Sequence, residues 1–281
     1  MAAPSVTVII HTLNEADQIS DCILSVQWAD EIYLIDSHST DGTVELVRSR
    51  FPDVRVEQRQ SLGSASQKNY AMDRARNEWV FVVDADERVP DSLRDEIGEV
   101  LSGNPQFWAY AVGRRNFVLG KEVHYGGLQR DRVKRLFHRR HARYPNRRVH
   151  ADLVVDGSTG LLHRKLLHFY VRSFDHMIEK MTRYGVWGGA QLYVEGQRTR
   201  SHRIIGHAVV RFLRDYILNF GFLDGTRGLI VVGMHVYYTF WKYSKLWEYS
   251  ELERQGKEVK LPPFDVAEER WVLPWQQKKP G

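Results

Sequence analysis

The sequence predicts an α/β protein with a doubly wound, mostly parallel sheet, helices on both of its faces, and a C-terminal α-helical extension. Strand-like and helix-like segments alternate over residues 5–102, as they do when helices join parallel strands. Over residues 172–250, apolar residues recur instead at helical spacing. We therefore expect a domain over 1–168, a helical region over 169–250 and a tail over 251–281.

The predicted sheet begins with four short apolar runs that alternate with amphipathic segments. The strands fall at 6–11, 31–35, 53–57 and 79–83, and the helices at 17–27, 64–75, 93–101 and through Val44, Leu46 and Val47. The run WVFVV at 79–83 has no polar position, which is typical of a strand buried on both faces. Further strands at 107–118, 133–138 and 161–168 predict a mixed or antiparallel extension.

Three carboxylates follow the fourth strand within four residues, in the segment Asp84-Ala85-Asp86-Glu87. Charges of one sign repel, so this cluster suits a strand end that opens into a cleft where a divalent cation offsets the charge. Mg²⁺ and Mn²⁺ take oxygen ligands and are often shared between carboxylates and substrate phosphates. An acidic turn before the helix that begins near Asp91 and Ser92 explains this segment equally well.

Polar clusters follow three of the predicted strands, at residues 12–15, 36–43 and 84–87. The carboxyl ends of parallel strands share one edge of a sheet, and ligands of such sheets bind beyond that edge. The sequence has no GxGxxG after the first strand and no GxxxxGK[ST], so it carries neither a dinucleotide fingerprint nor a P-loop. The three loops predict a ligand site of another kind.

The charge balance favours a partner that carries phosphate. The net charge is +5 and the isoelectric point is about 9.2, which suits a nucleotide, an anionic membrane surface or nucleic acid. Alternation over 132–137 places part of a basic run on one strand face, where Arg132 and Arg135 can meet a diphosphate or an anionic acceptor. A solvated face explains the run as well. No nucleic-acid-binding motif accompanies it, so nucleic acid is not expected.

The single cysteine, Cys22, excludes an intrachain disulfide and is expected in a reducing compartment. Its apolar helical surroundings predict a buried structural thiol.

No signal peptide is expected, because no basic stretch precedes the first apolar run. The longest apolar candidate for a membrane span, 229–241, is shorter than the ~20 residues that a bilayer requires.

Residues 228–247 concentrate aromatic rings and include two lysines, Lys242 and Lys245. Rings at headgroup level beside lysines that meet anionic lipid are typical of a membrane-interface helix. The same pattern suits a helix hairpin packed on the domain over 1–168 or on a second subunit, so the sequence does not decide whether this chain forms an oligomer.

The polar loops together indicate a nucleotide-sugar site. Asp36 is placed to accept a hydrogen bond from a base or ribose, and Lys68 to act electrostatically near a base or phosphate. Asp84 and Asp86 are placed to hold ribose and a metal ion. A metal that bridges both phosphates stabilises a nucleoside diphosphate as it leaves, which glycosyl transfer requires.

At these positions the chain resembles glycosyltransferase family 2, and most closely its branch of lipopolysaccharide-core β-glucosyltransferases. The resemblance covers nearly all of residues 5–250. Its segments are TLNEA (12–16), ADEIYLIDSHSTDGT (29–43), QKNYAMD (67–73), WVFVVDADERVP (79–90), RVKRLFHR (132–139), RRVHADLVVDG (147–157), LLHRKLLHFYVRS (161–173), EKMTRYGVWGGAQ (179–191) and FLRDYILNFGFLDGTRGL (212–229).

The resemblance implies a GT-A fold, which is Rossmann-like, a UDP-sugar donor, Mg²⁺ or Mn²⁺ at a DxD motif, and inversion at the anomeric carbon. It makes residues 1–168 the catalytic domain that binds the nucleotide sugar. Matched residues are Thr12, Asn14 and Glu15 in the first nucleotide loop, Asp36 as the uracil contact, Lys68 near it, Asp84 and Ala85 on the ribose side of the DxD motif, and Asp86 as the metal ligand.

One departure concerns the general base that an inverting enzyme needs to deprotonate the acceptor hydroxyl. The branch often has a His-Glu pair where this chain has His150-Ala151. Asp152 lies one residue further on and would point to the opposite face of a strand, although in a loop it can still serve. Our hypotheses are Asp152 as the base, or His150 in its place.

The expected function is metal-dependent transfer of a hexose, most readily glucose from UDP-glucose, to a lipopolysaccharide-core or other lipid-linked acceptor. The expected place is the cytoplasm, peripherally on the inner face of the cytoplasmic membrane. A polyprenyl-phosphate acceptor is an alternative, since an ionised phosphate needs no base. Ala151 also keeps open a nucleotide-sugar-binding or scaffold protein that has lost catalysis.

Overall fold

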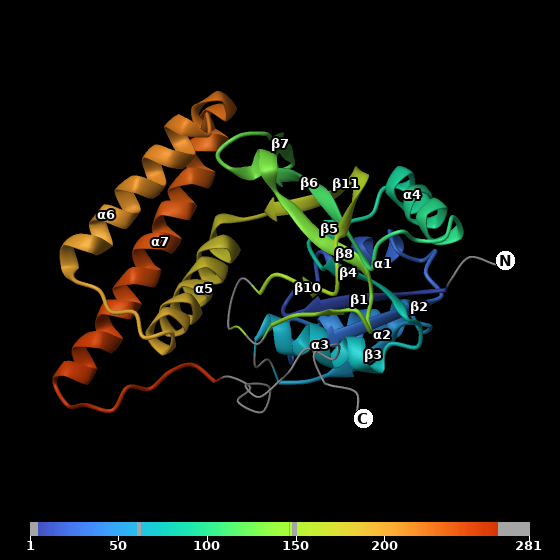
Figure 1. Ribbon diagram of the computed structural model, residues 1–281, viewed down its shortest axis with the longest axis horizontal. Helices are drawn as coiled ribbons and strands as arrows, with labels where there is room; N and C mark the ends of the chain where they lie inside the picture. The colour runs from blue at the N-terminus through green and yellow to red at the C-terminus, as the bar shows by residue number, and fades with distance from the viewer. Residues whose placement is uncertain (1–4, 61–62, 146, 148–150, 264–281) are drawn as a thin grey trace.

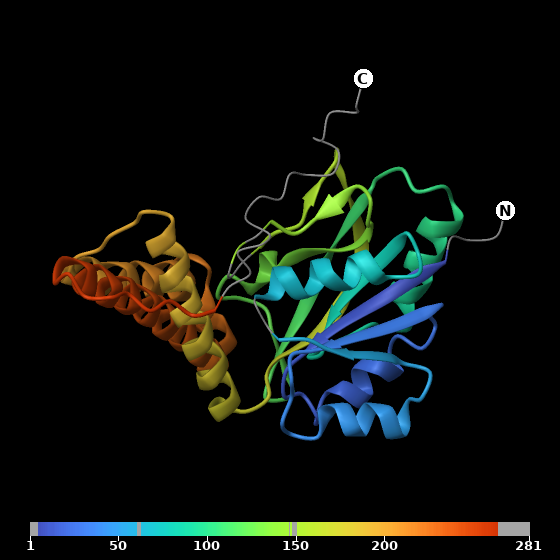
Figure 2. The ribbon, with the colours of Figure 1, turned by 90° about the horizontal axis from the view of Figure 1, so that it is seen from below.

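The structure is a computed structural model, and it describes residues 5–60, 63–145, 147 and 151–263. A sheet covered by helices lies beside a lobe of long helices (Figures 1 and 2). The strands are β1 (Val6–Thr12), β2 (Glu31–Asp36), β3 (Arg55–Gln58), β4 (Trp79–Asp84), β5 (Glu87–Arg88), β6 (Ala109–Val118), β7 (Lys121–Val123), β8 (Arg132–His138), β9 (Ala142–Arg143), β10 (Val154–Val155) and β11 (Thr159–Val171). The helices are α1 (Ile19–Leu24), α2 (Thr43–Arg50), α3 (Ser64–Arg74), α4 (Asp91–Ser102), α5 (Phe174–Val194), α6 (Ser201–Phe212) and α7 (Gly225–Arg254).

Four parallel strands in the order β3-β2-β1-β4 form the half of the sheet that the apolar runs predict. Successive side chains of β1 point to opposite faces. Ile9 packs with Met72 of α3 on one face, and Ile10 packs with Ile23 of α1 and Ile97 of α4 on the other. All five side chains are buried, so the prediction of helices on both faces is confirmed.

Several predicted elements differ from the observed ones at their ends; β11, for example, is longer than its predicted strand at 161–168. α1 ends at Leu24, before the predicted end of its helix at residue 27, because turns follow it. β3 begins at Arg55 rather than at residue 53. Within α1, Cys22 is fully buried as predicted, and burial raises the pKa of its thiol.

The other half of the sheet is mixed, as the sequence predicts. β8 runs antiparallel to β4 and β6, and β11 runs parallel to β6. β5 was not expected: its residues Glu87 and Arg88 pair with His168 and Leu167 of β11. This pairing fixes the acidic segment, which begins at the end of β4, against β11 at the far edge of the sheet.

The C-terminal helices form the separate lobe, in which α7 packs between α5 and α6 (Figure 1). Its base is an apolar cluster that includes Val118, Val171, Met177 and Val231, and so joins the ends of β6 and β11 to α5 and α7. No single described helix is long and apolar enough to cross a membrane. The segments Ser201–Leu218 and Gly221–Arg254, bent by 70° relative to each other, are together long and apolar enough by length and composition alone. The domain boundary at residue 168 stays a prediction.

Three glycines on one face of α5 let α7 approach closely. A Cβ added to Gly189 would lie 2.8 Å from the carbonyl oxygen of Lys242, and one added to Gly185 would lie 2.5 Å from a ring carbon of Trp241. Both distances are shorter than real non-bonded contacts, so α5 and α7 can lie this close only because Gly185 and Gly189 have no side chains.

We therefore expect Gly189→Ala to destabilise the protein by about 1–3 kcal/mol, the usual cost of an overpacked core. Gly206→Ala is the matched control, because a Cβ there would meet nothing within 4 Å. In a helix interior that change should stabilise by about 0.5–1 kcal/mol. Urea unfolding of both variants measures the two effects, and equal shifts would show that the α5–α7 contact does not depend on Gly189.

Candidate active site

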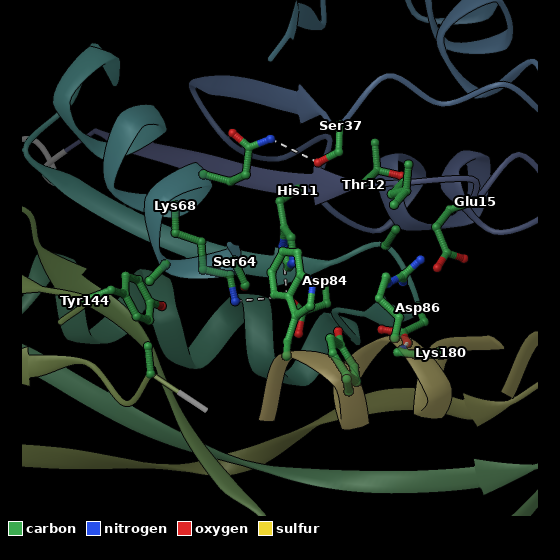
Figure 3. A pocket seen from close by; sticks show the side chains of 18 of the residues that line it. His11, Thr12, Glu15, Ser37, Ser64, Lys68, Asp84, Asp86, Tyr144 and Lys180 are labelled. Carbon is green, nitrogen blue, oxygen red and sulfur yellow. Dashed lines mark hydrogen bonds and ion pairs between the residues drawn. The ribbon is translucent and has the colours of Figure 1, made fainter. Parts of the chain in front are cut away.

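A cavity of about 470 Å³ opens beyond the carboxyl ends of β1 and β4, at the sheet edge that the polar loops predict. It is bounded on the far side by α5. Its polar and aromatic lining residues are His11, Thr12, Glu15, Ser37, Ser64, Gln67, Lys68, Asp84, Asp86, Arg114, Tyr144, Arg147, His168, Tyr170, Lys180, Arg183, Tyr184 and Trp187. In the view of Figure 3, Lys68 and Tyr144 lie on one side of Asp84, and Asp86, Lys180 and Glu15 on the other.

Asp84 is surrounded by cations at the end of β4. Its carboxylate accepts hydrogen bonds from Arg135 at 2.5 and 3.3 Å and lies 3.4 Å from Lys68 Nζ and 3.2 Å from His11 Nδ1. Burial opposes ionisation of Asp84, but Arg135, Lys68 and His11 outweigh it and hold the pKa of Asp84 well below its usual range. Asp84 is therefore an anion at neutral pH, held between β1, α3 and β8.

Asp86 faces the other wall of the cavity. Its carboxylate accepts a hydrogen bond from Lys180 Nζ of α5 at 2.8 Å and lies 3.7 Å from His168 Nε2 of β11. Burial raises the pKa of Asp86, but Lys180 and His168 outweigh that effect and bring it well below its usual range. His168 is held in turn by Asn116, at 2.6 Å from its Nδ1.

Glu15 lines the cavity and is largely buried. Its carboxylate lies 2.9 Å from Arg172 and 3.7 Å from His176 Nε2. Burial and the nearby Asp86 raise the pKa of Glu15 to about 7. Glu15 is thus the predicted site carboxylate whose charge changes near neutral pH.

Two predicted nucleotide contacts, Asn14 and Asp36, are absent from the cavity lining and instead shape its loops. The Asn14 side chain accepts a hydrogen bond from the Thr40 amide at 2.9 Å. Asp36 is fully buried and accepts hydrogen bonds from the Ser39 amide at 2.9 Å and the Gln58 side chain at 3.1 Å. Their direct contact with a nucleotide stays a prediction.

The two predicted diphosphate or acceptor contacts on β8 differ from each other. Arg135 is buried and binds both Asp84 and Glu87, the latter at 2.7 Å, so its charge is already committed inside the protein. Arg132 is exposed at the start of β8 and is not part of the cavity lining. Neither guanidinium faces the cavity in this structure.

The predicted base region is only partly described. His150 lies outside the described residues. Ala151 lines the cavity, whereas the Asp152 side chain is 79% exposed and binds Lys134 Nζ at 2.9 Å. Asp152 therefore does not reach the cavity in this structure, and its role as the base stays a hypothesis.

Sequence reasoning missed the α5 wall of the cavity, formed by Lys180, Arg183, Tyr184 and Trp187. Helical spacing alone predicts packing positions for Tyr184 and Trp187. Their spacing also places all four residues on one helix face, and a stripe of this kind that carries two cations departs from an apolar packing face. That departure is the signal that would have found them.

The donor atoms present suit a metal ion shared with a substrate. No group of three or more His, Cys, Asp and Glu residues capable of holding a metal occurs among the described residues. Arg135 and Lys68 already compensate the charge of Asp84, which leaves Asp86, the partner of Lys180, as the carboxylate that would hold a metal ion. Mg²⁺ commonly binds through one or two carboxylates and takes its other ligands from phosphates and water, so Asp86 fits this role.

The fold and this site define the class of protein: the chain belongs to glycosyltransferase family 2, whose family model, "Glycosyl transferase family 2", matches residues 7–169. The chain is 31% identical over 244 residues to the lipopolysaccharide core biosynthesis glycosyltransferase LpsC of Rhizobium meliloti (strain 1021), across 85% of this chain and 90% of LpsC. It is 24% identical over 253 residues to an uncharacterized glycosyltransferase of Rickettsia prowazekii (strain Madrid E), across 86% of each chain. The protein is accordingly a glycosyltransferase.

Solved structures show weaker similarity. The S. aureus TarS 1-349 structure covers 91% of this chain and 93% of its own, with a TM-score of 0.45 and 14% identity. Glucosyl-3-phosphoglycerate synthase from Mycobacterium tuberculosis, in complex with Mn²⁺, uridine diphosphate and glucosyl-3-phosphoglycerate, covers 41% of this chain and 44% of its own, with a TM-score of 0.33 and 22% identity.

Proposed function

We propose that this protein transfers a hexose, most readily glucose from UDP-glucose, to a sugar of the lipopolysaccharide core or of another lipid-linked glycan. The observation that carries the proposal is the cavity in which Asp84 and Asp86 lie among Lys68, Lys180 and Arg183. Carboxylates suit ribose hydroxyls and a metal, and the cations suit a diphosphate. The similarity to LpsC supports the acceptor class.

Each wall of the cavity has a part in this reaction. The loops around Thr12 and Ser37 hold the nucleoside beside Lys68. Asp84 stays ionised and accepts hydrogen bonds from the ribose hydroxyls. Lys180 and Arg183 of α5 face the diphosphate. A metal ion held by Asp86 would neutralise the charge that develops on the leaving diphosphate. Trp187 and Tyr184 offer aromatic faces to a sugar ring.

Incubation with UDP-glucose, Mn²⁺ and lipopolysaccharide with a truncated core tests the proposal. We expect UDP release together with a gain of one hexose in the mass of the acceptor. UDP-galactose and UDP-N-acetylglucosamine, tested in parallel, identify the donor sugar. Bound UDP-glucose with no transfer to any lipopolysaccharide, under conditions where transfer to another lipid-linked glycan occurs, would reassign the acceptor.

We also propose that the helical lobe rests peripherally on the inner face of the cytoplasmic membrane. α6 and the turns after it expose an apolar face consisting of Ile205, Val209, Val210, Leu213, Ile217, Leu218, Phe220, Phe222 and Leu223. Arg203 and Arg214 are exposed on the same segment, where they can meet anionic headgroups. Most aromatic rings of 228–247 are instead partly buried; Trp241, for example, packs on Gly185 of α5.

The double variant Val210→Glu/Leu218→Glu should lower binding to phosphatidylglycerol-containing vesicles by at least about tenfold, since each burial of such a side chain is worth about 1.5–3 kcal/mol. The wild-type side chains are 63% and 71% exposed, so the fold should tolerate the change. Leu24→Glu, at a residue of α1 that is 47% exposed, is the control. Unchanged sedimentation of the double variant with vesicles would contradict a membrane role for this face.

A further inference from the structure

A chain of three hydrogen-bonding side chains runs from the helical lobe into the active-site cavity. Tyr170 of β11 lines the cavity, and its hydroxyl lies 3.1 Å from His235 Nε2 of α7. His235 Nδ1 lies 3.1 Å from the Asp215 carboxylate. His235 is 65 positions from Tyr170 and 20 from Asp215 in sequence, so only the fold brings the three side chains together.

The direction of each hydrogen bond follows from Asp215. Its side chain is 1% exposed and also accepts hydrogen bonds from Arg211 at 2.5 Å and Arg214 at 2.9 Å. Burial raises the pKa of Asp215, but His235 and the two arginines outweigh that effect and hold it below its usual range. An ionised carboxylate can only accept, so His235 Nδ1 carries the proton and donates it.

This tautomer leaves the lone pair of His235 Nε2 facing the Tyr170 hydroxyl. Burial, opposed by Asp215, lowers the pKa of His235, so the ring is neutral near pH 7 and Nε2 accepts the Tyr170 proton. The lone pairs of Tyr170 Oη then remain for a donor in the cavity. An acceptor-sugar hydroxyl is such a donor.

We propose that Tyr170, His235 and Asp215 form the proton relay that activates the acceptor hydroxyl, in place of the carboxylate missing at Ala151. This inference rests on the proposed glycosyl transfer. The acceptor oxygen gives its proton to Tyr170 Oη while Tyr170 gives its own proton to His235 Nε2. The electron pair of the acceptor oxygen forms the bond to the anomeric carbon, and the bond from that carbon to the diphosphate breaks, with its electron pair leaving on UDP.

Each member of the relay has a distinct part. Tyr170 is the catalytic residue that touches the acceptor. Burial raises the pKa of Tyr170 to about 12, so its hydroxyl is protonated at neutral pH and can take the acceptor proton only while it passes its own proton on. His235 takes the proton, and Asp215 is the positioning residue that sets its tautomer and stabilises the imidazolium. Around the relay, the charges of Lys180, Arg211, Arg114 and Asp131 shift the pKa of Tyr170, and those of Asp215, Arg211 and Arg214 shift the pKa of His235.

The first test needs no substrate. Nitrogen NMR of the wild-type protein should find His235 neutral at pH 7.5, with the proton on Nδ1 and a bare Nε2. A proton on Nε2 would overturn the relay, because that nitrogen could not then accept the Tyr170 proton. The Tyr170→Phe variant should leave the tautomer unchanged and move the Nε2 resonance.

The second test is the pH profile of kcat with UDP-glucose and truncated-core lipopolysaccharide. We expect an acid limb below about pH 6.5 in the wild type, because protonated His235 cannot accept. His235→Asn keeps a donor toward Asp215 and removes the base, so kcat should fall by about 10²–10⁴-fold and the acid limb should disappear. Tyr170→Phe removes only the hydroxyl. It should lower kcat and abolish the acid limb in the same way, while UDP affinity stays at the wild-type value.

Two controls distinguish the relay from a base elsewhere in the chain and from a general effect of losing a histidine. His207→Asn makes the same change at a histidine that stacks on Tyr243 of α7, outside the cavity lining, and should keep the wild-type profile. If Asp152→Asn abolishes turnover while His235→Asn retains it, Asp152 is the base and the relay is overturned. If the wild type binds no UDP, the proposed function fails, and the relay fails with it.

Discussion

Replacing Arg135 with Met is expected to destabilise the protein by about 3–5 kcal/mol, the usual cost of removing one partner from a buried ion pair. The Arg135 side chain is 4% exposed, and it lies 2.5 Å from Asp84 and 2.7 Å from Glu87. Glu87 is fully buried, so the variant leaves two carboxylates with less compensation in a poorly solvated site. Urea unfolding at pH 7 measures the loss.

The loss should depend on pH in a defined direction. Because the folded-state pKa of Asp84 is depressed, its contribution to stability is present above its unfolded pKa of about 3.9 and is lost as the pH falls through the folded value. The difference between wild type and Arg135→Met should therefore shrink below about pH 4. Arg132→Ala, three residues earlier on the same strand and exposed, should change stability by no more than about 0.5 kcal/mol. Equal losses for the two variants would contradict a stabilising role for the buried pairing of Arg135.

The second large effect is expected for Asp86→Asn. The amide keeps the size of the side chain but removes the charge that a metal ion or Lys180 binds, so turnover should fall by at least about 10²-fold. Steady-state rates of UDP release from UDP-glucose with truncated-core lipopolysaccharide provide the measurement. Asp53→Asn, at an exposed residue outside the cavity lining, is the control. If Asp86→Asn keeps wild-type turnover, the Asp86 carboxylate has no role in the reaction.

The parallel half of the fold could be predicted because its signals are local. The apolar runs at 6–11 and 79–83 are long enough to identify buried strands, and polar residues mark the loops at their ends. β5 could not be predicted, because Glu87 and Arg88 are polar and form a strand only through pairing with β11. Local pattern predicts the parallel strands, whereas tertiary pairing decides the opposite edge of the sheet, at β5.

In the site, too, the sequence predicts individual residues but not the side chains with which they interact. Asp84 and Asp86 line the cavity, as their position after a strand predicts. The partner of Asp86 is Lys180, 94 residues away in sequence, and no local pattern connects the two. Burial was also invisible in the sequence: Arg135 looks like a surface cation on an alternating strand, but its side chain is buried against Asp84 and Glu87.

A donor site at the end of β4 is tested most directly by calorimetry of the purified protein with UDP and with UDP-glucose, each in Mn²⁺ and in chelator. We predict binding of both ligands that is stronger in Mn²⁺ and that loses its metal dependence in Asp86→Asn. No binding of either ligand under any of these conditions would contradict the assignment of this cavity as a nucleotide-sugar site.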